Sequence, residues 1–166
     1  MELNELQDEV TALGDALRRR GWRLATAESC TGGLIAAACT SVAGSSDWFE
    51  RGYVSYSNLA KTQMLGVDAA LIAAHGAVSE AVARAMAQGA AAQAGVDLAL
   101  AVTGIAGPGG AVPGKPVGLV WLALAQRSSA GLQLQAERLQ LPGDRSAVRE
   151  RTLRLALQRL RYAAAA

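Results

Sequence analysis

The chain has 166 residues, of which 51% are hydrophobic, and it carries a formal net charge of +2. This length suits one domain with a substantial core, so we expect residues 1–166 to fold as a single domain. No apolar run approaches the ~18 residues of a membrane span, and the acidic, amphipathic start lacks the pattern of a secretory or transit signal.

Helices and strands alternate along most of the chain. In chain order we expect an amphipathic helix over 3–20, a strand over 22–28, a small-residue helix over 31–42, a strand over 51–57, a short helix over 59–66, a helix over 79–94, an apolar strand over 97–104, an irregular segment over 104–116, strands over 117–126 and 132–141, and a last helix from Asp144 to Tyr162. Helices join the first three strands, which should be parallel, whereas the last two strands lack a helical crossover. We therefore expect an α/β fold, a three-layer α/β/α sandwich around a mixed, mostly parallel sheet of about five strands.

Polar side chains and a glycine-rich loop follow the first three predicted strands. Glu28 to Thr31 follow the first strand, Tyr56 to Lys61 the second, and Thr103 to Lys115 the third. In an open α/β sheet, ligands collect beyond the carboxyl ends of parallel strands. We therefore expect a serine, a tyrosine, a lysine, a threonine and the glycine-rich loop to meet at one edge of the sheet.

Three familiar catalytic and binding patterns do not fit. Residues 109–116 resemble a phosphate-binding loop, but a proline replaces the hydroxyl residue that would hold magnesium and a strand follows where a helix is required. Ser29 is not in a nucleophile elbow, because Ala27 and Thr31 stand where glycines are needed. A Ser-His-Asp triad would need His75, the only histidine, which we interpret as a turn or cap residue. One histidine and no cysteine pair at ligand spacing predict no metal site, and we expect no cofactor.

The basic residues are unevenly divided between two types. Fourteen are arginines, scattered along the chain, and only Lys61 and Lys115 are lysines. The scatter argues against a nucleic-acid partner, which requires a concentrated basic face. Arginine cannot act as a base, whereas a buried lysine can lose its proton near neutral pH. Position therefore suggests Lys61, at the start of a short helix, as a base, and Lys115, between a glycine and a proline, as a permanent charge facing an anion.

A neutral Lys61 that accepts the proton of Ser29 would form a Ser/Lys dyad. The backbone N–H groups that follow Ser29 can form an oxyanion hole or hold a phosphate. The alternative is that Ser29 and Thr31 are ordinary helix N-caps. Cys30 is a second candidate nucleophile, although free cysteines are usually small buried hydrophobes and no histidine is near it in the sequence. With only two cysteines, Cys30 and Cys39, the chain lacks a disulfide framework, which favours a cytoplasmic location.

Six motifs together resemble the CinA carboxy-terminal-domain family. They are AESCTGG at 27–33, VSYSNLAK at 54–61, HGAVSE at 75–80, TGIAGPGG at 103–110, GKPVG at 114–118 and PGDR at 142–145. The resemblance covers roughly residues 5–160, and its stand-alone members are nicotinamide-nucleotide amidohydrolases. It implies hydrolysis of nicotinamide mononucleotide to nicotinate mononucleotide and ammonia by a metal-free Ser/Lys mechanism in pyridine-nucleotide salvage.

The resemblance also assigns roles to residues of this chain. It implies Ser29 as nucleophile, Lys61 as base, and Tyr56 and Thr103 as supporting residues. Glu28 would either face the cationic pyridinium or order the turn, and Arg145 would either bind phosphate or be an exposed residue of the last helix. The remaining candidate substrate-binding residues are Cys30, Thr31, Gly32, Gly33, Gly104, Gly107, Gly109, Gly110 and Lys115.

Two other functions remain open at this point. The same crevice would suit a module that binds a nucleotide without turnover, or an amidase for another small amide. Lys61 argues against the binding module, because a binding site would accept arginine there. The expected partner is a small-molecule substrate, and the alanine-rich helices suggest a homo-oligomer.

Overall fold

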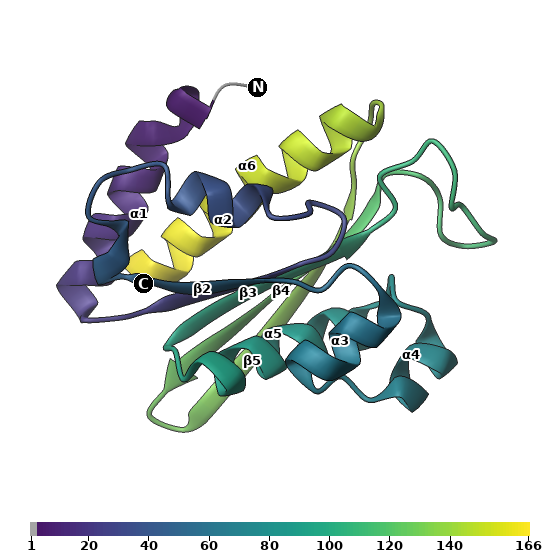
Figure 1. Cartoon of the computed structure of the whole chain (residues 1–166), viewed down its shortest axis with the longest axis horizontal. Coiled ribbons are helices and arrows are strands. Elements are labelled where there is room, and N and C mark those ends of the chain that lie inside the picture. The colour runs from purple at the N-terminus through teal and green to yellow at the C-terminus, as the bar shows by residue number, and fades with distance from the viewer. Residues whose placement is uncertain (1–2) are drawn as a thin grey trace.

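The computed structural model describes residues 3–166 and has a five-stranded sheet at its centre (Figure 1). The strand order across the sheet is β2-β1-β3-β4-β5. The strands are β1 (Leu24–Glu28), β2 (Phe49–Val54), β3 (Leu98–Gly104), β4 (Leu119–Ser128) and β5 (Gly131–Gln140). β1 pairs in parallel with β2 and β3, whereas β4 is antiparallel to both β3 and β5. Four strands therefore run in one direction and β4 alone runs the other way, which confirms the expected mixed sheet.

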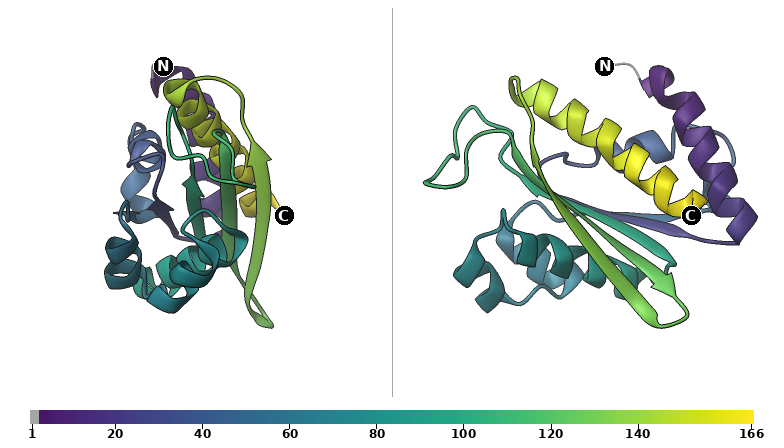
Figure 2. Two further views of the ribbon diagram at one scale, coloured as in Figure 1. Left: turned by 90° about the vertical axis from the view of Figure 1, so that its right-hand side faces the viewer. Right: turned by 180° about the vertical axis from the view of Figure 1, so that it is seen from behind.

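Helices cover both faces of the sheet. They are α1 (Gln7–Arg20), α2 (Leu34–Cys39), α3 (Asn58–Leu65), α4 (Ala69–His75), α5 (Glu80–Ala94) and α6 (Arg145–Ala165), with short 3₁₀ turns at Leu3–Leu6 and Ser45–Asp47. Figures 1 and 2 show α1, α2 and α6 on one face and α3, α4 and α5 on the other. This arrangement is the predicted three-layer α/β/α sandwich.

The two faces of the sheet differ in side-chain size. Along β3, Leu98, Leu100 and Val102 pack under α1 and α6, whereas Ala99 and Ala101 face α5. Strands β1 and β4 repeat this alternation, and α5 is itself rich in buried alanine. Small residues on both sides let α5 lie close to the sheet, while the larger side chains fill the layer below α6.

The observed elements differ from the expected ones in two places that matter for the site. Helix α2 begins at Leu34, not at Thr31, because Gly32 and Gly33 adopt positive φ angles of 59° and 97° and extend the turn after β1. Ser29 is therefore not the helix N-cap that the sequence suggested as one alternative. Helix α4 was not expected, and His75, which we interpreted as a turn or cap residue, is the last residue of this helix.

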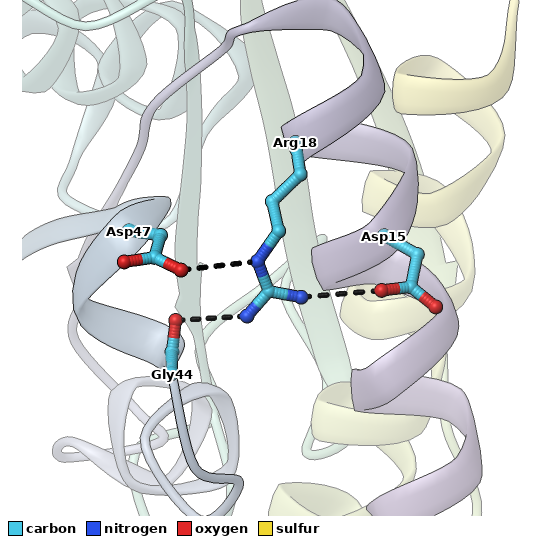
Figure 3. Close-up of polar contacts among 4 residues, drawn as sticks. All are labelled: Asp15, Arg18, Gly44 and Asp47. Carbon is cyan, nitrogen blue, oxygen red and sulfur yellow. Dashed lines mark hydrogen bonds and ion pairs between the residues drawn. The ribbon is translucent and has the colours of Figure 1, made fainter.

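Arg18 ties α1 to the turn that precedes β2 (Figure 3). Its guanidinium donates to Asp15 in α1 at 3.1 Å, to the Gly44 carbonyl at 2.9 Å and to Asp47 at 3.3 Å. These contacts, which lie at the protein surface, hold the segment before β2 against α1. No helix within residues 3–166 has the length and apolar composition needed to cross a membrane.

Candidate active site

Three hydroxyl residues line up where β2, β1 and β3 end. Alternation along each strand places Ser55, Ser29 and Thr103 on the face covered by α3 and α5. The Ser29 N–H donates to the Val102 carbonyl at 3.0 Å, so the strand ladder continues one residue past β1. The sheet thus presents Ser29 between its two neighbours, as the strand-end argument predicted.

Helix α3 brings Lys61 to this row. The helix begins after Ser57, whose side chain accepts the N–H of Ala60 at 3.0 Å. Lys61 is 1% exposed, and its Nζ lies 3.1 Å from Ser29 Oγ. The same nitrogen donates to the carbonyl oxygens of Ser55 at 3.0 Å and Tyr56 at 3.1 Å. Lys61 and Ser29, far apart in sequence, are in direct contact.

The surroundings of Lys61 favour its neutral form. Burial lowers the pKa of the amine below its ordinary value, and the nearby Cys30 opposes this shift. No carboxylate among residues 3–166 forms an ion pair with Lys61 that would restore the charge. A neutral amine has two N–H groups and one lone pair. In that form the Ser55 and Tyr56 carbonyls, which can only accept, would take the two N–H groups and leave the lone pair for the Ser29 hydroxyl.

A cavity of about 210 Å³ opens above the dyad. Its lining residues come from the three strand ends, α3, the segment before α5 and the start of α6: Ser29, Cys30, Tyr56, Asn58, Lys61, Ala77, Val78, Thr103, Gly104, Ala106 and Arg145. The Arg145 guanidinium donates to Tyr56 Oη at 3.1 Å and to the Gly107 carbonyl at 2.9 Å. An arginine and a tyrosine therefore stand together on the rim, with further guanidinium N–H groups available for a ligand.

The glutamate before Ser29 points to the opposite face of the sheet. Glu28 is 1% exposed, and its carboxylate accepts the Thr31 hydroxyl at 2.7 Å. It also accepts N–H groups at the start of α2, from Gly33 at 3.1 Å and Ala36 at 2.8 Å among others. Of the two roles considered for Glu28, the structure supports ordering of the turn, and the carboxylate is not directed at the cavity.

A family model described as the CinA C-terminal domain matches residues 6–164. The chain belongs to the CinA C-terminal domain family. It is 50% identical over 159 residues to the nicotinamide-nucleotide amidohydrolase PncC of Escherichia coli K12, covering 96% of this chain and 93% of that protein. It is 57% identical over 157 residues to a CinA-like protein of Citrifermentans bemidjiense, covering 95% of this chain. The chain spans only 36% of the length of that CinA-like relative.

The fold of this CinA domain also matches solved structures. One is the competence-damaged protein (CinA) superfamily protein of Klebsiella pneumoniae 700603, with a TM-score of 0.89 and 39% sequence identity over 99% of both chains. Another is the competence/damage-inducible protein of Agrobacterium tumefaciens, with a TM-score of 0.88 and 42% identity over 93% of both chains. The α/β sandwich is thus shared over nearly the whole chain.

Seven of the candidate residues line the cavity of the CinA domain: Ser29, Cys30, Tyr56, Lys61, Thr103, Gly104 and Arg145. Thr103 is buried and donates to the Ala77 carbonyl at 2.9 Å, so it anchors the segment that precedes α5. Tyr56 contacts Lys61 through its backbone carbonyl. The residue is 58% exposed, and its phenol oxygen accepts a hydrogen bond from Arg145. Cys30 lines the cavity, but burial raises the pKa of its thiol to about 12. At neutral pH the thiol stays protonated, which argues against Cys30 as nucleophile.

Lys115 lies apart from the cavity. Its Nζ donates to the carbonyl of His75 at 2.6 Å, at the end of α4, instead of pointing toward the dyad. Gly109 and Gly110 also do not line the cavity, and Gly104 is the glycine of this loop that does. Thr31, Gly32 and Gly33 are engaged within the turn itself. Of the two candidate cations, Arg145 and not Lys115 therefore lies at the rim of the cavity.

Sequence reasoning missed three contributors. Asn58 lines the cavity from the first turn of α3, and the Ser55 carbonyl binds Lys61. Arg149 of α6 donates to the Thr31 carbonyl at 3.0 Å. Only Asn58 had a local signal, its place beside the Ser57 cap. Within the described part of the chain, no three His, Cys, Asp or Glu side chains gather as a metal site would require.

Proposed function

We propose that this CinA domain hydrolyses the carboxamide of nicotinamide mononucleotide to nicotinate mononucleotide and ammonia. The observation that carries the proposal is the 3.1 Å contact between the buried Lys61 Nζ and Ser29 Oγ. The name of the Escherichia coli relative, nicotinamide-nucleotide amidohydrolase, supports this substrate for a chain that matches it along nearly its full length. The chain would act as one catalytic domain.

The first half-reaction uses Lys61 as base and then as acid. Neutral Lys61 takes the proton of Ser29 as Oγ attacks the carboxamide carbon, and the carbonyl oxygen becomes an oxyanion. The ammonium then gives its proton to the nitrogen of the tetrahedral intermediate. The C–N bond breaks, ammonia leaves, and Ser29 carries a nicotinoyl ester.

In the second half-reaction, a water molecule replaces Ser29 as the nucleophile and Lys61 again acts first as base and then as acid. Lys61, neutral again, takes a proton from a water molecule that attacks the ester carbon. The ester bond to Ser29 Oγ then breaks, and Lys61 returns the proton to Oγ. The carboxylate product leaves with no net change in the enzyme.

The oxyanion needs donors that nothing else occupies. Gly32 N–H donates to the Ser29 carbonyl at 3.1 Å and Gly33 N–H to Glu28. Within residues 3–166, no oxygen acceptor is bonded to the N–H of Cys30 or Thr31. These two groups, directly after the nucleophile, are the oxyanion donors that we propose.

The substrate phosphate would lie outside the cavity. A volume of about 210 Å³ is below the roughly 300–1,000 Å³ typical of small-molecule sites, so the cavity suits the reacting ring and not the whole mononucleotide. Arg145 and Tyr56 on the rim are then placed to bind the ribose phosphate, because a guanidinium matches phosphate geometry well.

Ammonia release from nicotinamide mononucleotide by the purified protein tests the proposal. The wild type should release ammonia and form nicotinate mononucleotide in equal amounts. Mass spectrometry of rapidly quenched reactions should find the nicotinoyl group on Ser29. A protein that binds the mononucleotide but releases no ammonia would instead support the binding module.

A further inference from the structure

Two charged side chains that do not line the cavity hold the turn that carries Ser29. Glu28 binds it from the sheet, and Arg149 binds it from α6. Neither residue is within hydrogen-bond reach of Lys61 or Ser29 side chains among the contacts of the described chain. Any effect of either residue on Ser29 is therefore transmitted through the backbone of residues 29–33.

Glu28 replaces the missing cap of α2. The N-cap position is Gly33, which has no side chain to satisfy the first N–H groups of the helix. The Glu28 carboxylate accepts those of Gly33, Ile35 and Ala36 at 2.8–3.1 Å. The same carboxylate accepts the Thr31 hydroxyl, so a single buried group joins the end of β1 to the turn and to α2.

Arg149 holds the other side of the turn. Its Nη2 donates to the Thr31 carbonyl at 3.0 Å, while its Nε is buried without a hydrogen-bond partner in the described chain. The guanidinium lies close enough to Cys30 to favour the negative form of that thiol. A permanent positive charge thus stands beside the backbone groups proposed to bind the oxyanion.

We propose that Glu28 and Arg149 are positioning residues that keep the N–H groups of Cys30 and Thr31 aligned for the oxyanion. Between them they bind the Thr31 side chain, the Thr31 carbonyl and the Gly33 N–H, so they hold the turn from two sides. The proposal rests on the proposed hydrolysis. Because the oxyanion exists only after attack, misalignment lowers kcat and leaves KM nearly unchanged.

The test compares Arg149→Met and Arg149→Lys with Arg151→Met, an exposed arginine of the same helix. Arg149→Met keeps much of the stem but loses the donor and the charge, and we expect kcat to fall about 10- to 100-fold with KM within about twofold. Arg149→Lys restores one donor and the charge and should recover part of the loss. Glu28→Gln, which puts an amide among N–H donors, should show the same kcat effect when it is measured on folded protein.

A second readout does not depend on the natural substrate. Phosphonylation of Ser29 by a fluorophosphonate probe also develops charge on an oxygen, so the Arg149 variants should react more slowly by a similar factor. One outcome is that the wild type reacts with the probe, the Arg149 variants react more slowly, and none of these proteins releases ammonia from nicotinamide mononucleotide. In that case the proposed substrate is wrong and the positioning role stands. If Arg149→Met matches Arg151→Met in both kcat and probe rate at equal thermal stability, the positioning role is overturned.

Discussion

Gly89 in α5 controls how closely α3 can approach, and its replacement by alanine should move Lys61. A β-carbon at Gly89 would overlap the Leu65 carbonyl oxygen and lie 2.9 Å from the carbonyl carbon. Leu65 is the last residue of α3, one turn after Lys61. Ordinary contact for such a carbon begins near 3.4 Å, so α3 must shift outward by at least ~0.5 Å.

This shift acts on both activity and stability. The Lys61–Ser29 contact of 3.1 Å would lengthen toward or beyond hydrogen-bond range, and a misplacement of about 1 Å costs roughly 100-fold in rate. We expect kcat to fall about 10- to 100-fold. Overpacking costs about 1–3 kcal/mol, offset by about 0.5–1 kcal/mol from replacing glycine in a helix, so a net loss of up to about 2.5 kcal/mol should lower the melting temperature by up to about 10 °C.

Gly14→Ala is the matched control for Gly89→Ala. Gly14 also lies inside a helix, and a β-carbon there would lie 2.7 Å from Trp48 Nε1, far from the cavity. Both variants should lose thermal stability by scanning calorimetry. In the ammonia assay, run well below either melting temperature, only Gly89→Ala should lose activity. Full activity in Gly89→Ala, or an equal loss in Gly14→Ala, would refute the reasoning.

Three further predictions concern the dyad and the rim. Ser29→Ala and Lys61→Ala should each lower kcat by several orders of magnitude, and the double variant should lose hardly more, because the two side chains act as one unit; additive losses would contradict the dyad. Arg145→Ala should raise KM for nicotinamide mononucleotide about tenfold or more while Lys115→Ala should not, and the reverse pattern would place the phosphate elsewhere. The pKa of Lys61 is lowered in the folded state, so between that pKa and about 10.4 the folded state binds fewer protons than the unfolded state. In urea unfolding, the wild type should therefore gain stability relative to Lys61→Met as the pH rises through this window.

The Ser/Lys contact was predictable because strand ends converge. Ser29 and Lys61 follow parallel strands, whose carboxyl ends meet at one edge of the sheet. Because the chain has only two lysines among its basic residues, Lys61 was a candidate for a base that must lose its proton. The continuously apolar sequence of β3 likewise predicts a strand that is buried on both faces. These features depend on local pattern and topology, which the sequence carries directly.

Other parts of the site depend on conformations that no local pattern sets. Helix α2 begins three residues later than expected because Gly32 and Gly33 adopt positive φ angles. The Glu28 carboxylate then caps the helix. Lys115 binds the end of α4, a helix that was not expected. Arg149 contacts the Thr31 carbonyl because the packing of α6 directs this side chain toward the turn. Tertiary packing decides each of these contacts.

The measurement that tests the account most directly is the pKa of Lys61 itself. The chain has two lysines, so a Lys115→Arg variant labelled with ¹³C at lysine Cε gives a single signal that can be followed against pH. The account predicts a pKa clearly below the ordinary value of about 10.4, because the buried amine lacks an ion-paired carboxylate in the described chain. A titration at or above that value would mean that Lys61 is charged at working pH, and it would contradict a neutral lysine as the base for Ser29.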